Sequence, residues 1–114
     1  MLKIGFSKEK DILSVIFKGD FDESGAEDVK EELESLCNDG TNRKIIFNMG
    51  EVPYLSSFGI RELLNCVKMI DKCGGRYCFW GFNDNVRRVL EKSGLADILN
   101  IADLEKTAKQ KISD

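Results

Sequence analysis

The sequence contains no histidine, one proline and one tryptophan among its 114 residues. Without an imidazole, neither a serine–histidine nor a cysteine–histidine nucleophile pair can form, and zinc sites that need histidine are excluded. No apolar run approaches the roughly 20 residues that span a membrane. The four cysteines include no C-x-x-C pair and fit no zinc ribbon. We therefore expect a protein that is not an enzyme, has no cofactor or metal, and does not insert into a membrane.

An excess of positive charge is also missing. The 17 Lys and Arg residues are outnumbered by 20 Asp and Glu residues, which gives a net charge of −3. Without a basic run, direct binding to nucleic acid is not expected. The N-terminus has no long apolar stretch typical of a secretory signal, so a cytoplasmic location with free thiols is expected. The length predicts one domain over residues 1–114, with a core at about 2–108 and a frayed tail at 109–114.

Apolar strands alternate with amphipathic helices along the chain. Strands are predicted at 2–6, 12–18, 44–49 and 76–82, with a short edge strand at 98–101. Helices are predicted after a capping box at Ser24 and Glu27, over 57–73, after Asn83 with Val86, Val89 and Leu90 facing inward, and after a cap at Asp103. This order predicts an α/β fold with a mixed, mostly parallel β-sheet of 4–5 strands and about four α-helices.

The most distinctive segment is the loop at 50–59, between the 44–49 strand and the next helix. Sites in open α/β sheets lie at the carboxyl ends of the strands. Ser56 and Ser57 stand there, where a serine is an ordinary helix N-cap. A serine here could also accept a phosphate, which the free N–H groups and the helix dipole would stabilise. The added negative charge beside Leu55 and Phe58 would disrupt an apolar interface.

Residues 52–64, with the sequence VPYLSSFGIRELL, resemble the signature loop and helix of STAS domains, the family of the anti-sigma factor antagonists and their relatives. Three further segments match the family pattern in the right order. They are Gly19-Asp20-Phe21-Asp22 after the second strand, Gly74-Gly75 before an apolar strand, and residues 86–95, which end in Ser-Gly-Leu. The resemblance covers about residues 2–108 and implies a single STAS-like domain.

The resemblance implies a bacterial, cytoplasmic regulator of transcription in a partner-switching cascade. An anti-sigma factor that is also a serine kinase would phosphorylate Ser57, with Ser56 as the rival acceptor, and a phosphatase would reverse the reaction. The sequence departs from the family pattern in having Ser56 in place of an acidic residue and Phe58 in place of a small one. Asp20 and Asp22 either line the acceptor site or only form the turn and cap the helix. The partner-binding residues implied are Asp20, Asp22, Leu55, Ser56, Ser57, Phe58, Gly59 and Arg61.

Two other functions remain open at this point. A STAS protein can be a permanent subunit of a membrane-associated transport assembly, in which case Ser57 would only belong to the helix cap. It can also bind a nucleotide or another small ligand at the same strand ends. No G-x-x-x-x-G-K-[ST] loop is present to support nucleotide binding. Phosphorylation of Ser57 would distinguish the switch from the permanent subunit.

Overall fold

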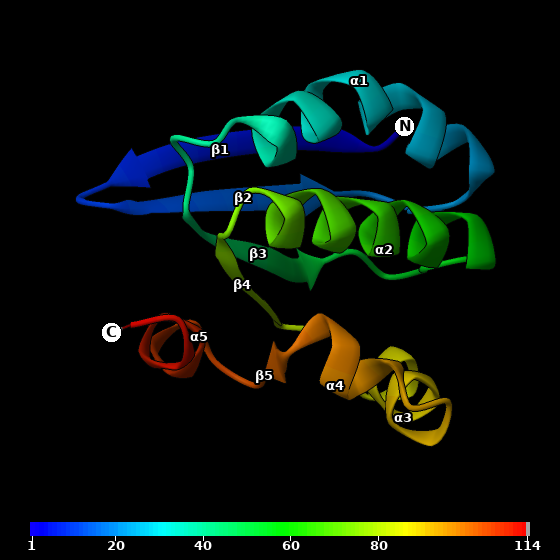
Figure 1. Ribbon diagram of the computed structural model, residues 1–114. Coiled ribbons are helices and arrows are strands. Elements are labelled where there is room, and N and C mark those ends of the chain that lie inside the picture. Colours follow the sequence, from blue (N-terminus) through cyan, green and yellow to red (C-terminus); the bar gives the residue numbers. More distant parts are fainter. Residues whose placement is uncertain (114) are drawn as a thin grey trace.

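Five strands form one sheet in which every strand lies beside its neighbour in the sequence (Figure 1). The computed structural model describes residues 1–113. The first two strands pair antiparallel as a hairpin, and the other pairs are parallel. The predicted α/β fold with a mixed, mostly parallel sheet is confirmed. The strands are β1 (Lys3–Glu9), β2 (Ile12–Lys18), β3 (Lys44–Glu51), β4 (Arg76–Trp80) and β5 (Ile101–Ala102).

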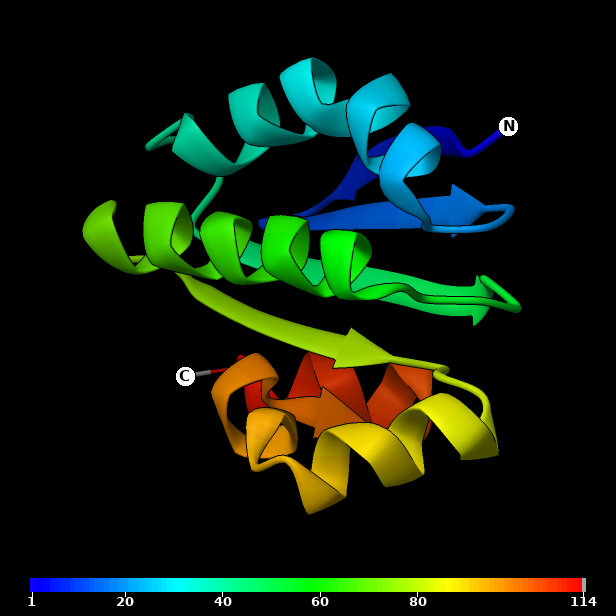
Figure 2. The ribbon, with the colours of Figure 1, turned by 90° about the vertical axis from the view of Figure 1, so that its right-hand side faces the viewer.

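Helices cover the two faces of the sheet unequally. Figure 2 looks onto one face, with α1, α2 and α3 in front of the strands and α5 behind them. Right-handed crossovers between parallel strands place α1 and α2 on the same side. In the part of the chain that the structure describes, α5 covers the second face beside β3, β4 and β5. The helices are α1 (Glu23–Asn38), α2 (Ser57–Lys72), α3 (Asp84–Lys92), α4 (Leu95–Leu99) and α5 (Glu105–Lys111).

The main core lies between the sheet and the helices α1 to α4. Phe47 is at its centre, with ring centroids 6.3 Å from Phe17 and 4.3 Å from Phe79. All three rings are fully buried. The alternation of strand residues explains the arrangement, because every second side chain of β2 points to this face. From the helices, Leu33 and Leu63 complete the packing.

A second, smaller core lies under α5. It consists of Ile46, Cys78, Ala108 and Ile112, with Trp80 packed against it. The indole Nε1 of Trp80 is buried and has no hydrogen-bond partner among residues 1–113. The predicted frayed tail is wrong here, because α5 continues through Lys111 and Ile112 is fully buried. Asp114, the last residue of that predicted tail, lies outside the described residues.

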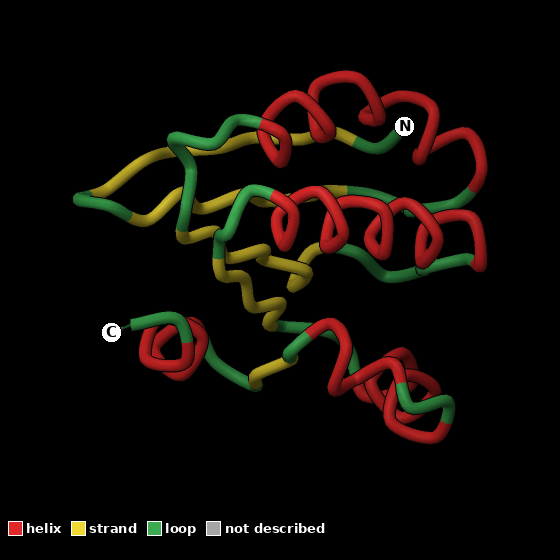
Figure 3. The backbone as a smooth tube through the Cα atoms, in the orientation of Figure 1, coloured by secondary structure: helices red, strands yellow, loops and turns green. Residues whose placement is uncertain are grey.

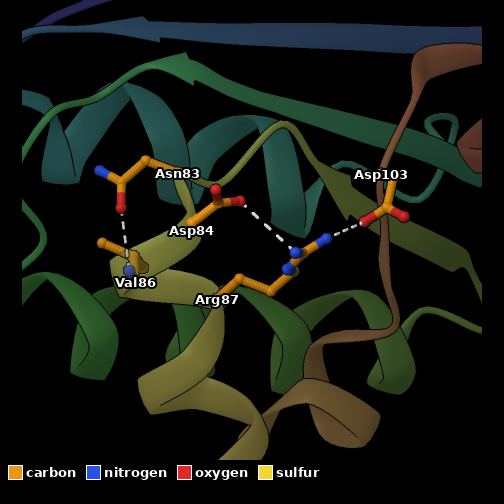
Figure 4. Close-up of polar contacts among 5 residues, drawn as sticks. All are labelled: Asn83, Asp84, Val86, Arg87 and Asp103. Atoms are coloured by element: carbon orange, nitrogen blue, oxygen red, sulfur yellow. Dashed lines mark hydrogen bonds and ion pairs between the residues drawn. The ribbon is translucent and has the colours of Figure 1, made fainter.

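Two predicted helix caps are also wrong. The α1 helix is capped by Asp22, whose carboxylate accepts a hydrogen bond from the Gly25 N–H at 2.7 Å, and not by Ser24. Asp103 does not cap α5, which follows Leu104 and has no side-chain cap. Instead, the Asp103 carboxylate pairs with Arg87 of α3 (Figure 4). The guanidinium therefore joins α3 to the β5–α5 turn.

The segment after α3 differs most from the prediction. Residues 95–99 form the short helix α4, and the edge strand begins at Ile101 and not at Ile98 (Figure 3). The described chain thus has five helices where about four were predicted. Val89 was predicted to face inward, but 59% of it is exposed. Asn83 does cap α3, as predicted, by accepting from the Val86 N–H at 2.9 Å (Figure 4).

Candidate functional site

The site is built where the β2–α1 turn and the β3–α2 loop meet. Because β2 and β3 are parallel neighbours, their carboxyl ends lie together. Phe21 in the turn forms a single parallel β-bridge with Leu55 in the loop. The Phe21 N–H donates to the Tyr54 carbonyl at 2.8 Å, and the Ser56 N–H donates to the Phe21 carbonyl at 2.9 Å. The backbone of one loop therefore fixes the position of the other.

Gly59 makes this contact possible. A Cβ atom at this position would lie 2.5 Å from the Phe21 carbonyl oxygen and 2.8 Å from a methyl group of Leu55. These distances are far below van der Waals contact, and the nearest atom belongs to the backbone, which cannot rotate away. The predicted binding residue Gly59 is thus a buried spacer in α2 that lets the turn approach the helix.

The two serines of the loop have different environments. Ser56 is the half-buried N-cap of α2, and its hydroxyl accepts from the Gly59 N–H at 3.2 Å and donates to the Phe21 carbonyl at 3.1 Å. Ser57 is the first residue of α2 and is exposed. Its hydroxyl makes no hydrogen bond to any of the residues 1–113. Ser57 therefore carries the hydroxyl that is free to react.

The two aspartates of the turn also differ. The Asp22 carboxylate is engaged as the α1 cap, which is the structural role weighed for it from the sequence. Asp20 is exposed, and its side chain makes no hydrogen bond or ion pair with the described residues. Both flank Phe21, whose carbonyl is held by Ser56. The structure therefore brings both aspartates to the edge of the site, but leaves only Asp20 with a free carboxylate.

Phe58 and Arg61 project from the first turns of α2. Phe58 is 44% exposed, so its ring is not a core side chain. The Arg61 guanidinium lies 5.9 Å from the centre of the Phe58 ring, at the outer limit of a cation–π contact. Arg61 is also four residues after Ser57, and residues at this spacing share one face of a helix. We call Asp20, Leu55, Ser57, Phe58 and Arg61 the Ser57 surface.

An apolar groove beside the loop was not predicted. It has a volume of about 290 Å³ and lies between the β3–α2 loop and α3, lined mainly by Pro53, Tyr54, Ile60, Val86 and Val89. Tyr54 is 54% exposed at its edge. Asn83 closes one end of it by donating to the Pro53 carbonyl at 3.1 Å. The sequence signal for the groove was Tyr54, a large aromatic residue in a loop, but assigning Val89 to the core concealed it.

The Ser57 hydroxyl lies at the N-terminus of α2, beside the Arg61 guanidinium on the same helix. Among residues 1–113, no cluster of three or more metal-ligating side chains exists. The first turn of α2 contains no acidic residue. Helix N-termini present unpaired N–H groups and a partial positive charge, which favour an anion. The start of α2 is therefore a place where a negative charge is favoured.

Comparison with known proteins gives consistent results. The family model of the STAS domain matches residues 4–108. BtrV of Bordetella bronchiseptica, which carries the description of an anti-sigma factor antagonist, is 26% identical over 94% of this chain and 91% of its own. The anti-sigma F factor antagonist of Paenibacillus polymyxa is 25% identical over 94% of this chain and 92% of its own.

Solved structures share the fold at lower identity. An anti-sigma factor antagonist from Mycobacterium paratuberculosis superposes with a TM-score of 0.88 at 16% identity, covering 100% of this chain and 96% of its own. The Bacillus cell fate determinant SpoIIAA in its phosphorylated form gives a TM-score of 0.72 at 18% identity, covering 97% and 100%. Within residues 1–113, no helix combines the length and apolarity needed to cross a bilayer. The match over nearly the whole length shows that the chain belongs to the STAS domain family.

Proposed function

We propose that this protein is an anti-sigma factor antagonist, and that phosphorylation of Ser57 ends its binding to an anti-sigma factor. The observation that carries the proposal is the difference between the two serines. The Ser56 hydroxyl is committed to Gly59 and Phe21, whereas the Ser57 hydroxyl is exposed and unbonded within the described chain. A kinase can reach Ser57 without breaking a contact of the fold.

The relatives support the same function. The curated relatives from Bordetella and Paenibacillus are described as antagonists of anti-sigma factors. SpoIIAA, a structural neighbour, has been solved in a phosphorylated form. We infer that the partners here are an anti-sigma factor acting as a serine kinase and a phosphatase that removes the phosphate. The protein would act in the bacterial cytoplasm as a binding module and a kinase substrate, and not as an enzyme.

The charge at the site explains how a phosphate could switch binding without unfolding the domain. A phosphoserine at the first position of α2 lies against the positive end of the helix dipole, which stabilises it. Arg61, one turn further along, offers a guanidinium on the same face. The phosphate nevertheless adds up to about two negative charges beside the exposed Phe58 ring. A partner that packs against this ring would have to desolvate those charges.

Phosphopeptide mass spectrometry and a binding assay test the proposal together. The protein and its Ser57→Ala and Ser56→Ala variants are treated with the kinase that co-purifies from the native cells. Wild type and Ser56→Ala are expected to gain one phosphate at Ser57, whereas Ser57→Ala gains none and still binds the partner. Ser57→Glu is expected to bind at least tenfold more weakly, the equivalent of about 1.4 kcal/mol.

Other outcomes would overturn specific parts of the proposal. A phosphate on Ser56 would make the rival serine the acceptor and contradict the role of its capping bonds. The absence of phosphate in cells under every stress tested, together with a stably bound membrane-associated partner, would support a permanent transport subunit.

A further inference from the structure

Glu62 is the only charged side chain that is buried among the described residues, with 4% of the residue exposed. It lies on α2, five residues after Ser57, on the side of the helix that packs against α1. Ionised carboxylates are almost never buried unless a cation or several hydrogen-bond donors compensate for the lost hydration. The groups around Glu62 therefore decide its charge.

Within residues 1–113, the cation that pairs with Glu62 is Lys30, which is shared with a second carboxylate. The Lys30 Nζ lies 3.9 Å from Glu62 Oε1 and 3.6 Å from Glu34 Oε2. Both distances exceed that of a direct hydrogen bond, and the Lys30 side chain is 52% exposed. One solvated ammonium thus faces two carboxyl groups, and it cannot fully neutralise both.

The two carboxyl groups lie close together across the α1–α2 interface, because the same Lys30 Nζ pairs with an oxygen of each. After burial, the neighbouring Glu34 is the next cause that raises the pKa of Glu62. The Cys66 thiol is a weak donor, with its Sγ 3.9 Å from Glu62 Oε2. Hydrogen bonding to Cys37 and burial raise the pKa of the Cys66 thiol, so Cys66 stays neutral and adds no charge.

The remaining groups near Glu62 lie at the mouth of a groove of about 250 Å³ between α1 and α2. Its polar lining includes acidic residues of α1 and two side chains of α2. The elements β4 and α4 also pack against α2, but their described residues place no charged side chain on Glu62. The groove is lined by Glu23, Ala26, Glu27, Lys30, Phe58, Arg61, Glu62 and Asn65.

We propose that Glu62, buried in the α1–α2 interface with a lysine that it shares with Glu34, binds a proton there and makes the packing of the two helices sensitive to pH. Burial, followed by the neighbouring Glu34, raises the pKa of Glu62 to about 7. With the proton bound, Glu62 is neutral and places no uncompensated charge in the interface. Loss of that proton leaves two carboxylates facing each other with one solvated lysine between them.

Because of the composition, few other side chains contribute to the pH dependence of stability near neutral pH. The chain has no histidine, and histidine is the side chain that ordinarily titrates between pH 5 and 8. The folded state holds a proton on Glu62 that the unfolded chain releases near pH 4.5. The folded protein is therefore stabilised at low pH, and this contribution is lost as the pH rises from about 4.5 through 7. The unfolding equilibrium constant is expected to rise up to about tenfold per pH unit in this window.

Urea unfolding between pH 5 and 8 tests the pair. Glu62→Gln cannot ionise and is expected to unfold with the same midpoint across the range. Glu34→Gln replaces a like charge with an amide donor, so the pH at which stability falls moves lower. Lys30→Met removes the cation, so the pH at which stability falls moves higher. Glu31→Gln, an exposed residue of α1, is the matched control and is expected to leave the wild-type profile unchanged.

A carboxyl carbon NMR titration of the wild type provides a second readout, because it follows Glu62 directly in the folded protein. If the wild-type unfolding constant is flat between pH 5 and 7, or if Glu62→Gln keeps the wild-type slope, the proposal is wrong. Shifts of the Glu34→Gln and Lys30→Met profiles in the same direction would equally contradict it, even if Glu62→Gln did not fold.

Discussion

The two faces of the sheet support different parts of the molecule. Ile45 and Ile46 are neighbours on β3 and are equally buried, but they point to opposite faces. Ile45 belongs to the main core under α1 and α2, and the Ser57 surface lies around the start of α2. Ile46 belongs to the small core under α5, at the other end of the chain. The helix that carries the site therefore packs on the main core, whereas the small core under α5 covers part of the opposite face.

Truncation of Ile45 or Ile46 is expected to give the largest losses of stability. Ile45→Ala should destabilise the fold by about 4–5 kcal/mol and Ile46→Ala by about 2–3 kcal/mol, within the range for buried isoleucine truncation. The reason for the difference is that α5 can settle onto a small cavity, whereas the aromatic stack around Phe47 cannot. Urea unfolding measures both. Equal losses would mean that the two cores are equally rigid.

The second largest loss of stability is expected at Gly59, where the β2–α1 turn lies close to α2. Gly59→Ala places a methyl group against the Phe21 carbonyl and is expected to cost about 1–3 kcal/mol, as overpacking does. It should also separate the β2–α1 turn from α2, so binding of the partner weakens. Gly40→Ala is the matched control, because a Cβ there meets nothing within 4 Å. Thermal unfolding compares the two, and equal effects would contradict the tight contact.

The cap of α1 is expected to give a smaller change. Asp22→Ala removes the acceptor of the Gly25 N–H and should cost about 1 kcal/mol, as the loss of a helix cap does. Ser24→Ala, at the position that the sequence indicated as the cap, should change stability by less than about 0.5 kcal/mol, as exposed substitutions do. A reversed order would restore Ser24 as the cap and show that the contact of Asp22 is incidental.

The smallest effect is expected at the surface between α3 and the β5–α5 turn. The side chain of Asp103 raises the pKa of Arg87 through a hydrogen bond, but both groups are open to solvent. Asp103→Asn should lower the melting temperature slightly at low salt and leave it unchanged at high salt, because exposed ion pairs are screened. Calorimetry at two ionic strengths measures this. A loss that persists at high salt would mean that the contact is structural and not ionic.

The sequence predicted the elements that form the main core. The apolar residues of α1 recur with the helical period, and Val29, Leu33 and Cys37 are buried. The run of β3 is continuously apolar, which suits a strand covered on both faces. The resemblance also predicted which two loops would meet at the site. These patterns are sufficient to predict the elements, because α1 is long and has one apolar side, and β3 is apolar on both.

The sequence did not identify the correct residue where two nearby residues could have the same structural role. Ser24 and Asp22 are both good helix caps. The helix begins at Glu23, directly after the Phe21 bridge to Leu55, so Asp22 is the residue at the cap position. Similarly, the sequence of two adjacent serines does not show which hydroxyl caps the helix and which is left without a hydrogen bond. The buried contact of Ser56 with Phe21 spans 35 positions of sequence, so no local pattern contains it.

The C-terminal third was harder to predict because its elements are short. The α4 helix has five residues, fewer than two turns, and gives no period to recognise. The burial of Ile112 depends on Ile46 and Cys78 across the sheet, while its sequence neighbours are polar. The grouping of Glu34 and Glu62 around Lys30 was missed for the same reason, since each residue resembles the many acidic residues of the surface.

The position of Trp80 has a consequence for spectroscopy. It is the only tryptophan, and it packs against the small core beside α5. Its fluorescence therefore reports on the face opposite α1 and α2, while far-ultraviolet circular dichroism follows all the helices together. Coincident unfolding curves from the two signals would show that both faces melt as one cooperative unit. An emission change upon phosphorylation at Ser57 would reveal a structural signal that crosses the sheet.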